Sequence, residues 1–241
     1  SSKDKQVLRK LGQQYMDIAT LPVQKEKVEL WKALNRSKMQ RPMVCIDQLP
    51  WNELNINDEL TCLVDDPFFR EVELDLRKKI YMWKHFPVDM VIEPFITIPK
   101  TIENSGYGLT EDSEKLELNK DSTAPARHFK RVLNDYEDIE KITDMRITVD
   151  NELSELHFQQ AKEIFDGVAP VIQGHGIQFH LGVWDYLITL MGVEDAYFEI
   201  MVRPEFVHAC MERITDATIA GIKAANELKV HNDISNTCHC S

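Results

Sequence analysis

RPMVCIDQLPWNEL, residues 41–54, joins a short apolar run to a polar loop that carries a tryptophan. The run Met43–Ile46 is rich in β-branched residues, is too short for a helix and is closed by Pro50, so it predicts a buried strand. Five functional side chains follow the carboxyl end of this strand: Asp47, Gln48, Trp51, Asn52 and Glu53. Because α/β proteins bind ligands at the carboxyl ends of their strands, the stretch predicts one wall of a binding site. In the alternative interpretation, Trp51 caps the core and the polar residues form a solvated turn.

The composition is that of a globular protein with an acidic surface. Of the 241 residues, 43% are hydrophobic and 28% are charged, and the net charge at pH 7 is -12. Such a surface repels phosphate backbones and anionic lipids, so we expect neither nucleic acid nor a membrane as a partner. No apolar run is long enough to span a bilayer, and the first residues, SSKDKQ, do not resemble a signal peptide. The five cysteines are an odd number and are scattered, which favours reduced thiols in a cytoplasmic protein.

Apolar residues at helical spacing predict that much of the chain is helical. The expected helices cover residues 4–19, a segment that begins at Pro22, and residues 66–86, 150–166, 184–191, 193–202 and 204–228. Further strands are expected within 89–99, 169–176 and 177–182. This alternation of helices and strands predicts a parallel sheet with crossover helices.

Glu93 interrupts the apolar run of the second expected strand, directly before Pro94. A carboxylate within an apolar strand is costly unless it is paired, hydrogen-bonded or bound to a metal. Glu93 is therefore a candidate catalytic residue. In the alternative interpretation it lies in a surface bulge before the proline.

Four segments carry a family resemblance: RPMVCIDQLPWNEL, DDPFFREVELDLRKKIYMWKHFPVDMVIEPF, EDIEKI and GVWDYLITLMGVEDAYFEIMVRPEFVHACMERITDATI. They resemble the uroporphyrinogen decarboxylase superfamily, which includes the decarboxylase of tetrapyrrole synthesis and the methyltransferases that work with corrinoid (cobalamin) proteins. The resemblance covers residues 30–241. Its most specific part is Trp184–Thr215, where a tryptophan opens one helix and Arg-Pro-Glu-Phe-Val begins the next.

The resemblance implies an α/β fold, a (β/α)8 TIM barrel of the uroporphyrinogen decarboxylase type, with its site at the carboxyl ends of the strands. A barrel of this type takes roughly 250 residues, and the sequence indicates only three or four strands. We therefore expect the N-terminal half of a barrel. The expected organisation is a helical segment at residues 1–40 and the first part of the barrel at 41–241, with a polar insert at about 101–135.

Decarboxylation of uroporphyrinogen itself is disfavoured. The resemblance implies an Arg-x-x-x-Arg loop after the first strand and an aspartate near the end of the second, which hold the carboxylates of that substrate. Here the loop Asp47–Leu54 has two acids and no arginine, and the aspartate position falls near Ile96. Acids repel a polyanionic substrate, so the methyltransferase branch is the better match.

The methyltransferase branch implies a zinc ion held by histidine and cysteine at strand ends. Zinc turns a thiol into a nucleophile or polarises the leaving heteroatom of a methyl donor. The candidate metal ligands are Cys238, His239 and Cys240, although they do not follow the family's His-x-Cys pattern. Adjacent residues of a strand point to opposite faces, so either the two cysteines ligate together or His239 points inward without them. An ordinary cysteine-rich strand is the alternative.

Further candidates lie between residues 175 and 185. Gln178 and His180 share one face of an expected strand, close to Trp184 and Asp185. His175 stands between two glycines, which let the backbone approach a ligand closely. A hydrogen-bonded structural histidine at 180 and a plain turn at 175 are the alternatives.

Together, the sequence and the resemblance predict a protein that transfers a methyl group between a small methylated substrate and a corrinoid protein. The expected catalytic residues are Asp47, Glu93, His180 and Asp185. The expected substrate-binding residues are Gln48, Trp51, His175, Gln178 and Trp184. The expected cofactors are zinc and the corrinoid of the partner protein. Two alternatives stay open, a lyase that decarboxylates a smaller acid and a non-catalytic binding protein of the same fold.

Overall fold

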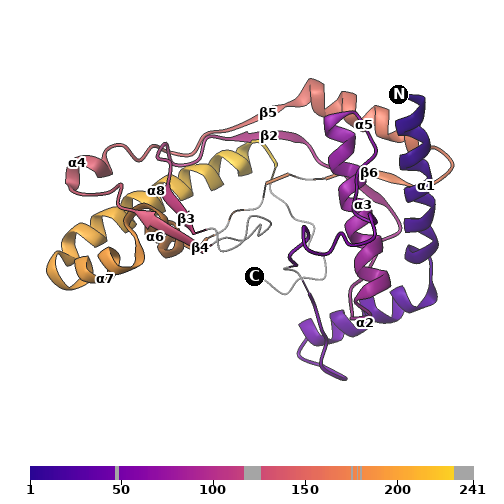
Figure 1. Cartoon of the computed structure of the whole chain (residues 1–241), viewed down its shortest axis with the longest axis horizontal. Coiled ribbons are helices and arrows are strands. Elements are labelled where there is room, and N and C mark those ends of the chain that lie inside the picture. The colour runs from indigo at the N-terminus through magenta and orange to yellow at the C-terminus, as the bar shows by residue number, and fades with distance from the viewer. Residues whose placement is uncertain (47–48, 117–125, 175, 178, 180, 231–241) are drawn as a thin grey trace. The chain divides into compact units, whose positions relative to one another are not determined.

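A computed structural model describes residues 1–46, 49–116, 126–174, 176–177, 179 and 181–230. The chain divides into two compact units, whose helices and strands are labelled in Figure 1. The first unit comprises Ser1–Lys100 and Asn151–Gly174, and the second comprises Thr101–Asp150 and His175–Asn232. No described helix combines the length and the apolar character needed to cross a bilayer.

Three helices at the start of the chain frame the first unit: α1 (Ser2–Ala19), α2 (Pro22–Asn35) and α3 (Pro67–His85). The first turns of α1 and α3 are capped by side chains. The Ser1 hydroxyl accepts a hydrogen bond from the Asp4 amide at 3.2 Å, and the Asp66 carboxylate accepts one from the Phe69 amide at 3.0 Å. Pro67 suits the first position of α3 because its missing N–H needs no partner there. These helices confirm the ranges predicted from apolar spacing.

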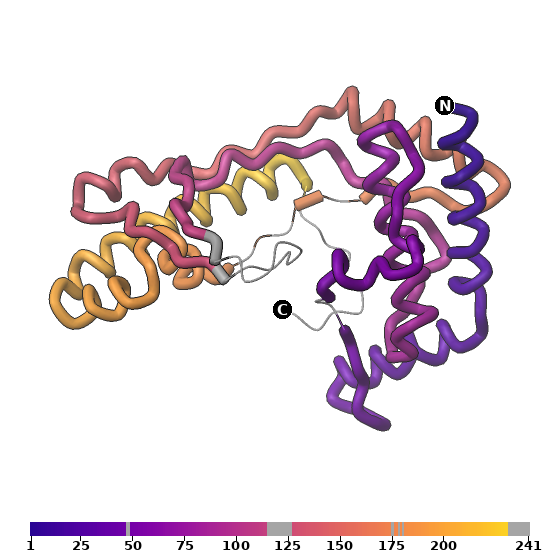
Figure 2. Tube along the Cα trace, viewed as in Figure 1, coloured from indigo at the N-terminus to yellow at the C-terminus, as the bar shows by residue number. Residues whose placement is uncertain are grey.

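An apolar core joins the helices of the first unit. Helix α1 contacts both α3 and α5 (Asn151–Phe165), and Figure 2 shows α1 running beside α3. Leu8 and Tyr15 of α1, Leu76 of α3 and Phe165 of α5 are all at most 3% exposed. A short parallel pair, β1 (Ile96–Ile98) and β6 (Val171–Gln173), packs against α5. Burial of these side chains is the main source of stability for the unit.

The prediction of a (β/α)8 barrel is wrong, because the described residues form three separate two-stranded sheets. The pair β1–β6 is parallel, whereas two further pairs are antiparallel: β2 (Thr101–Asn104) with β5 (Ile147–Asp150), and β3 (Asp112–Leu116) with β4 (Ala126–Lys130). A barrel requires parallel strands that each pair on both edges until the sheet closes. The described chain is instead a mixed α/β protein of eight helices and short strands.

The first expected strand, Met43–Ile46, is not part of any sheet that the structure describes. The Asp89 amide donates to the Val44 carbonyl at 3.1 Å, but the Val44 amide donates to the Asp89 carboxylate at 2.9 Å and not to a backbone carbonyl. The Arg41 guanidinium binds the same carboxylate at 2.6 and 2.9 Å and holds its pKa at about 2. The Asp89 carboxylate thus occupies the place that a backbone carbonyl of a neighbouring strand would take, and no strand pair forms at Val44.

The second expected strand, residues 89–99, is shortened at its proline. Pro94 has no N–H to donate to a neighbouring strand. The Phe95 amide donates to the Glu93 carbonyl at 2.8 Å, so the backbone turns around Pro94. β1 begins only at Ile96, whose amide donates to the Pro170 carbonyl at 2.9 Å.

The second unit is built around a long helix, α8 (Pro204–Glu227), which packs against α6 (Val183–Met191), α7 (Val193–Val202) and the short α4 (Tyr136–Ile139). The fully buried apolar side chains of the second unit include Leu133, Leu187, Leu190, Met191, Phe206, Cys210 and Ile214. Gly192, at φ 81, separates α6 from α7. Its backbone amide donates a hydrogen bond to the Ile188 carbonyl at 2.8 Å, which closes the last turn of α6. A positive φ is strained for residues with a side chain, so glycine suits this junction. The helices predicted at 184–191, 193–202 and 204–228 are confirmed.

A buried carboxylate joins three segments of the second unit. Glu199 of α7 is 3% exposed. Its side chain accepts hydrogen bonds from Arg131 at 2.6 Å and from Arg203 at 2.7 Å. Both guanidinium groups also donate to the Asn134 carbonyl. The two arginines hold the pKa of Glu199 at about 2, below its ordinary value of 4.5, because they stabilise the ionised form more than burial disfavours it.

A partly buried imidazole lies in the core of the first unit. His157 of α5 stacks on the Phe68 ring, with 3.6 Å between centroids and an interplanar angle of 13°. Its Nδ1 atom is buried and has no hydrogen-bond partner among the described residues. The contact is therefore apolar in character and leaves one polar atom unsatisfied.

Replacement of Glu199 by Gln is expected to lower stability at neutral pH by about 1.5–3 kcal/mol, because the partly exposed Arg131 and Arg203 lose a buried, charged hydrogen-bond acceptor. Since the pKa of Glu199 is depressed in the folded protein, the parent keeps this contribution above the unfolded pKa of 4.5 and loses it as the pH falls toward about 2. Urea denaturation at about pH 6 and about pH 3 measures both effects. The variant is expected to show the smaller loss on acidification, and Glu212→Gln on an exposed site of α8 is the control. Equal acid sensitivity of parent and Glu199→Gln would contradict the assignment.

Replacement of His157 by Phe is expected to leave stability unchanged or to raise it by about 1 kcal/mol. The new ring keeps the stacking on Phe68 and removes the unsatisfied buried nitrogen. Thermal denaturation of the variant beside His157→Ala, which also loses the ring, is the measurement. A melting temperature for the Phe variant as low as that of the Ala variant would show that the nitrogen has a partner.

Candidate functional site

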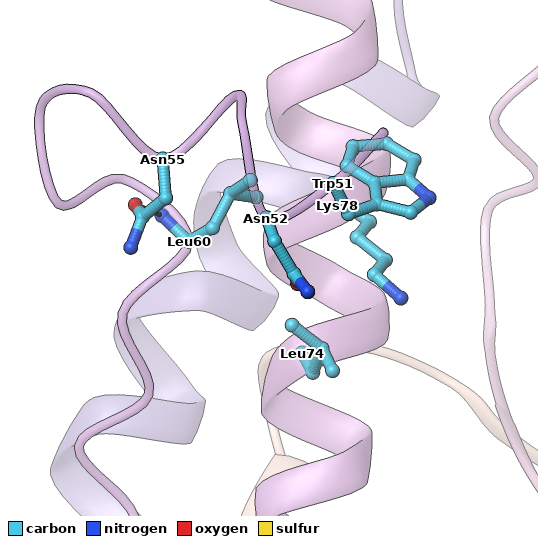
Figure 3. Close-up of a pocket in the computed structure, with 6 residues that line it drawn as sticks. All are labelled: Trp51, Asn52, Asn55, Leu60, Leu74 and Lys78. Atoms are coloured by element: carbon cyan, nitrogen blue, oxygen red, sulfur yellow. Dashed lines mark hydrogen bonds between the residues drawn. The ribbon is translucent and has the colours of Figure 1, made fainter. Parts of the chain in front are cut away.

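The first unit contains a cavity of about 340 Å³ between one loop and helix α3. We name it the Trp51 cavity after the largest of its lining residues, which are Trp51, Asn52, Asn55, Leu60, Leu74 and Lys78. Figure 3 shows Trp51 beside Lys78, with Leu74 one turn away on the same helix. The volume lies near the lower end of the range for small-molecule pockets, so the cavity suits a small organic ligand.

A tight turn at Leu49–Leu54 places Trp51 over α3. The Trp51 amide donates to the Leu49 carbonyl at 2.9 Å, and the Glu53 amide donates to the Pro50 carbonyl at 2.8 Å. Tyr81 of α3 fixes the far end of the turn, since its hydroxyl donates to the Leu54 carbonyl at 3.1 Å. The rings of Trp51 and Tyr81 meet edge to face, with centroids 6.3 Å apart. The indole is therefore held at the rim of the cavity by contacts on two sides.

The opposite wall is a loop organised by an asparagine. The Asn55 side chain accepts a hydrogen bond from the Leu60 amide and donates one to the Thr61 hydroxyl, each at 2.9 Å. Thr61 in turn donates to the Asp58 carboxylate at 3.0 Å. Asn and Asp commonly stabilise loops through such side-chain bonds to nearby backbone. The result is that Leu60, only 7% exposed, points its apolar side chain into the wall.

The loop is anchored to α3 by a buried carboxylate. Glu73 is fully buried and accepts hydrogen bonds from the Leu63 and Val64 amides at 2.8–3.0 Å. Arg77, one turn further along α3, donates to Glu73 at 2.8 Å and to the Glu59 carbonyl at 3.0 Å. We name this group the Glu73 anchor. It ties the chain on both sides of Leu60 to the helix that forms the cavity floor.

A second electrostatic contact holds the loop at the far end of α3. The Glu59 carboxylate accepts hydrogen bonds from Lys84 at 2.7 Å and from His85 at 3.0 Å. The bond from Lys84 lowers the pKa of Glu59 more than burial raises it. Glu59 is thus ionised at neutral pH and engaged away from the cavity.

Four of the predicted site residues lie in described parts of the chain. Trp51 lines the cavity, whereas Glu93 belongs to the same unit without lining it. Glu93 is half-buried and, after burial itself and Asp75, contributes to the raised pKa of Tyr15. Trp184 and Asp185 belong to the second unit, where Trp184 packs edge to face on Tyr197 at 6.3 Å and Asp185 is exposed in the first turn of α6.

The remaining predicted residues lie outside the described residues: Asp47, Gln48, His175, Gln178, His180, Cys238, His239 and Cys240. Within the ranges that the structure describes, no group of three His, Cys, Asp or Glu side chains has the arrangement of a metal site. The zinc site at Cys238, His239 and Cys240 therefore stays a prediction, and no step of the chemistry below depends on it.

Sequence reasoning did not single out Asn55, Leu60, Leu74 or Lys78, although all four line the cavity. Lys78 falls outside the apolar stripe of its helix, and a lysine at such a position is ordinarily solvated. The available signal was the spacing of Leu74 and Lys78, four residues apart and thus on one face of α3. The sequence does not show that the Trp51 loop packs against this face of α3, and that packing is what forms the cavity.

Comparison with known proteins adds no relative. No family model, no curated protein and no solved structure matches this chain. The resemblance to the uroporphyrinogen decarboxylase superfamily stays a prediction from the sequence.

Replacement of Glu73 by Gln is expected to destabilise the first unit by about 3–5 kcal/mol, since it leaves Arg77 without its buried counter-charge. The Leu63 and Val64 amides both bond Oε2, so the one amide oxygen of Gln keeps them only if its NH2 group faces the Arg77 guanidinium, donor against donor. The free energy of unfolding in urea and the chemical shift of the Trp51 indole N–H are the measurements. Glu71→Gln, at an exposed site of α3, is the matched control. If both variants behave like the parent, the Glu73 anchor does not hold the loop.

Proposed function

We propose that the protein binds a small methylated molecule in the Trp51 cavity and exchanges its methyl group with a corrinoid carried by a partner protein. The observation that carries the proposal is a small cavity lined by an indole, two leucines and three polar side chains, Asn52, Asn55 and Lys78. Small-molecule sites have this composition, with apolar area for affinity and a few polar groups for orientation. The resemblance of four sequence segments to corrinoid-dependent methyltransferases supports the reaction type.

The residues of the cavity have distinct parts in this proposal. Trp51, Leu60 and Leu74 provide apolar surface against which a bound methyl donor packs. Asn55 fixes the loop wall through its hydrogen bonds to Leu60 and Thr61, so the apolar surface is already in place before a ligand binds. The corrinoid acts as the second substrate and supplies cobalt(I), the nucleophile for the methyl group. The electron pair of cobalt(I) would form the new bond to the methyl carbon and leave cobalt(III). The bond between the methyl carbon and its heteroatom would break, its electron pair would stay on the heteroatom, and a proton from water would neutralise it.

A lyase that decarboxylates a small acid is the second candidate. The observation that favours it is the Lys78 ammonium on the cavity wall, because a cation attracts a carboxylate. The two candidates differ in the fate of the bound molecule, since a lyase releases carbon dioxide and does not alter a corrinoid.

The test mixes the protein with a cobalt(I) corrinoid protein and a panel of methoxylated aromatics, methylamines and methyl thiols. Formation or loss of the methylated corrinoid is followed by absorbance in both directions. We expect at least one panel member to change the spectrum. We expect Trp51→Ala to lower that rate by about tenfold or more, because the substrate loses its positioning surface. Ile56→Ala is the control, since Ile56 lies in the same loop, is 81% exposed and does not line the cavity.

Two outcomes would contradict the proposal. If no panel member changes the corrinoid spectrum and carbon dioxide is released from a small acid, the lyase is the better assignment. If the Trp51 and Ile56 variants react at equal rates, the methyl donor is bound elsewhere in the protein.

A further inference from the structure

Lys78 differs from its two neighbours on α3 in having no counter-charge. Arg77 pairs with Glu73 at 2.7 Å, and Lys79 pairs with Asp75 at 2.8 Å. In the part of the chain that the structure describes, no ion pair or hydrogen bond engages the Lys78 ammonium. Its contact is with the Trp51 ring, where the nitrogen lies 5.3 Å from the ring centroid. A half-buried cation held only by an aromatic face keeps its hydrogen-bond donors available.

Asn52 offers a second available donor on the same cavity. It follows Trp51 directly in the tight turn, and its side chain makes no hydrogen bond to the described residues. Asn55, by contrast, has both ends of its amide engaged with Leu60 and Thr61. The cavity thus has an ammonium and an amide that form no hydrogen bond to a described residue. It also has the apolar side chains of Leu60 and Leu74.

We propose that the Trp51 cavity recognises small carboxylic acids, with Lys78 and Asn52 binding the carboxylate and the apolar walls binding the remainder of the molecule. This inference rests on the proposed binding role of the Trp51 cavity and names the class of molecule that it takes. One ammonium balances the single charge of a carboxylate, and the amide supplies a further donor to the second oxygen. A phosphate carries more charge and more acceptors than one lysine and one asparagine satisfy.

The overall charge of the protein strengthens this assignment. With a net charge of -12, the molecule as a whole repels anions. The overall charge therefore does not attract an anionic ligand, and binding of such a ligand depends on a nearby cation. Lys78 is the titratable residue among the six that line the cavity.

The test titrates para-methoxybenzoate and its uncharged analogue, para-methoxybenzyl alcohol, into the isotopically labelled protein. The chain has four tryptophans, so the indole N–H signal of Trp51 is assigned with Trp51→Phe and then followed by NMR. We expect the acid to shift this signal and to bind about tenfold or more tightly than the alcohol, the effect of one charge-assisted contact.

Three variants identify the group responsible. Lys78→Met keeps the aliphatic stem and removes the charge, so the preference for the acid is expected to disappear while the alcohol binds as before. Lys78→Arg is expected to retain most of the preference. Lys79→Met, at the neighbouring position outside the cavity, is expected to leave it unchanged. Thermal denaturation of each variant checks that the fold is kept.

Three results would overturn the inference, and they differ in what they say about the cavity. If acid and alcohol bind with equal affinity and both shift the Trp51 signal, the cavity binds ligands but does not select acids, and the proposed function stands. If neither ligand shifts the signal at millimolar concentration, the cavity is not a binding site, and the proposed function fails with the inference. Loss of the acid preference in both Lys78→Met and Lys79→Met would show that the preference comes from the overall charge of the protein and not from Lys78.

Discussion

The contact of Glu73 with two backbone amides and Arg77 is the interaction on which the candidate site depends. The loop from Trp51 to Val64 has little regular structure of its own, and its amides need partners wherever water is excluded. Glu73 supplies two of these partners from inside the unit, and Arg77 balances its charge and reaches back to the Glu59 carbonyl. A carboxylate in this position is costly unless every bond is made. The same requirement fixes the loop in one arrangement, with Leu60 and Trp51 against α3.

Carboxylates have this role at three places in the described chain. Asp89 binds the Val44 amide and Arg41, and it thereby holds the segment after α2 beside the chain that leads to β1. Glu199 binds Arg131 and Arg203 and joins the chain after β4 to the start of α8. In each case an arginine neutralises the charge and a segment without regular structure is held in place. Short strands contribute little to either unit, so these side-chain contacts replace much of what a continuous sheet provides.

The same pattern explains why Lys78 is informative. Most cations near the loop are engaged: Arg77 with Glu73, Lys79 with Asp75, and Lys84 with Glu59. In a protein with an excess of acids, a half-buried lysine whose one contact to the described residues is with an aromatic ring is unusual. Lys78 lies on the wall of a cavity, where it has less contact with solvent than a surface lysine. Its electrostatic attraction for an anion is therefore stronger.

The sequence by itself determined the helices. Apolar spacing predicted their ranges closely, and Asp66 and Pro67 mark the start of α3, because a helix bonds residues four positions apart and is capped by its neighbours. The sequence located β1 and β6 within predicted strand segments, but it did not determine the other strands or the cavity. A strand exists only if a remote segment pairs with it, and near Val44 the Asp89 side chain took that place. Trp51 was recognisable as a candidate wall residue, but Leu60, Leu74 and Lys78 meet it only through the folding of the loop on α3. Arg77–Glu73 and Lys79–Asp75 are pairs four residues apart on one helix, a spacing that the sequence already shows. Only tertiary structure decided the long-range pairs, such as Arg41–Asp89 and Arg131–Glu199, because the chain brings these residues together from distant positions.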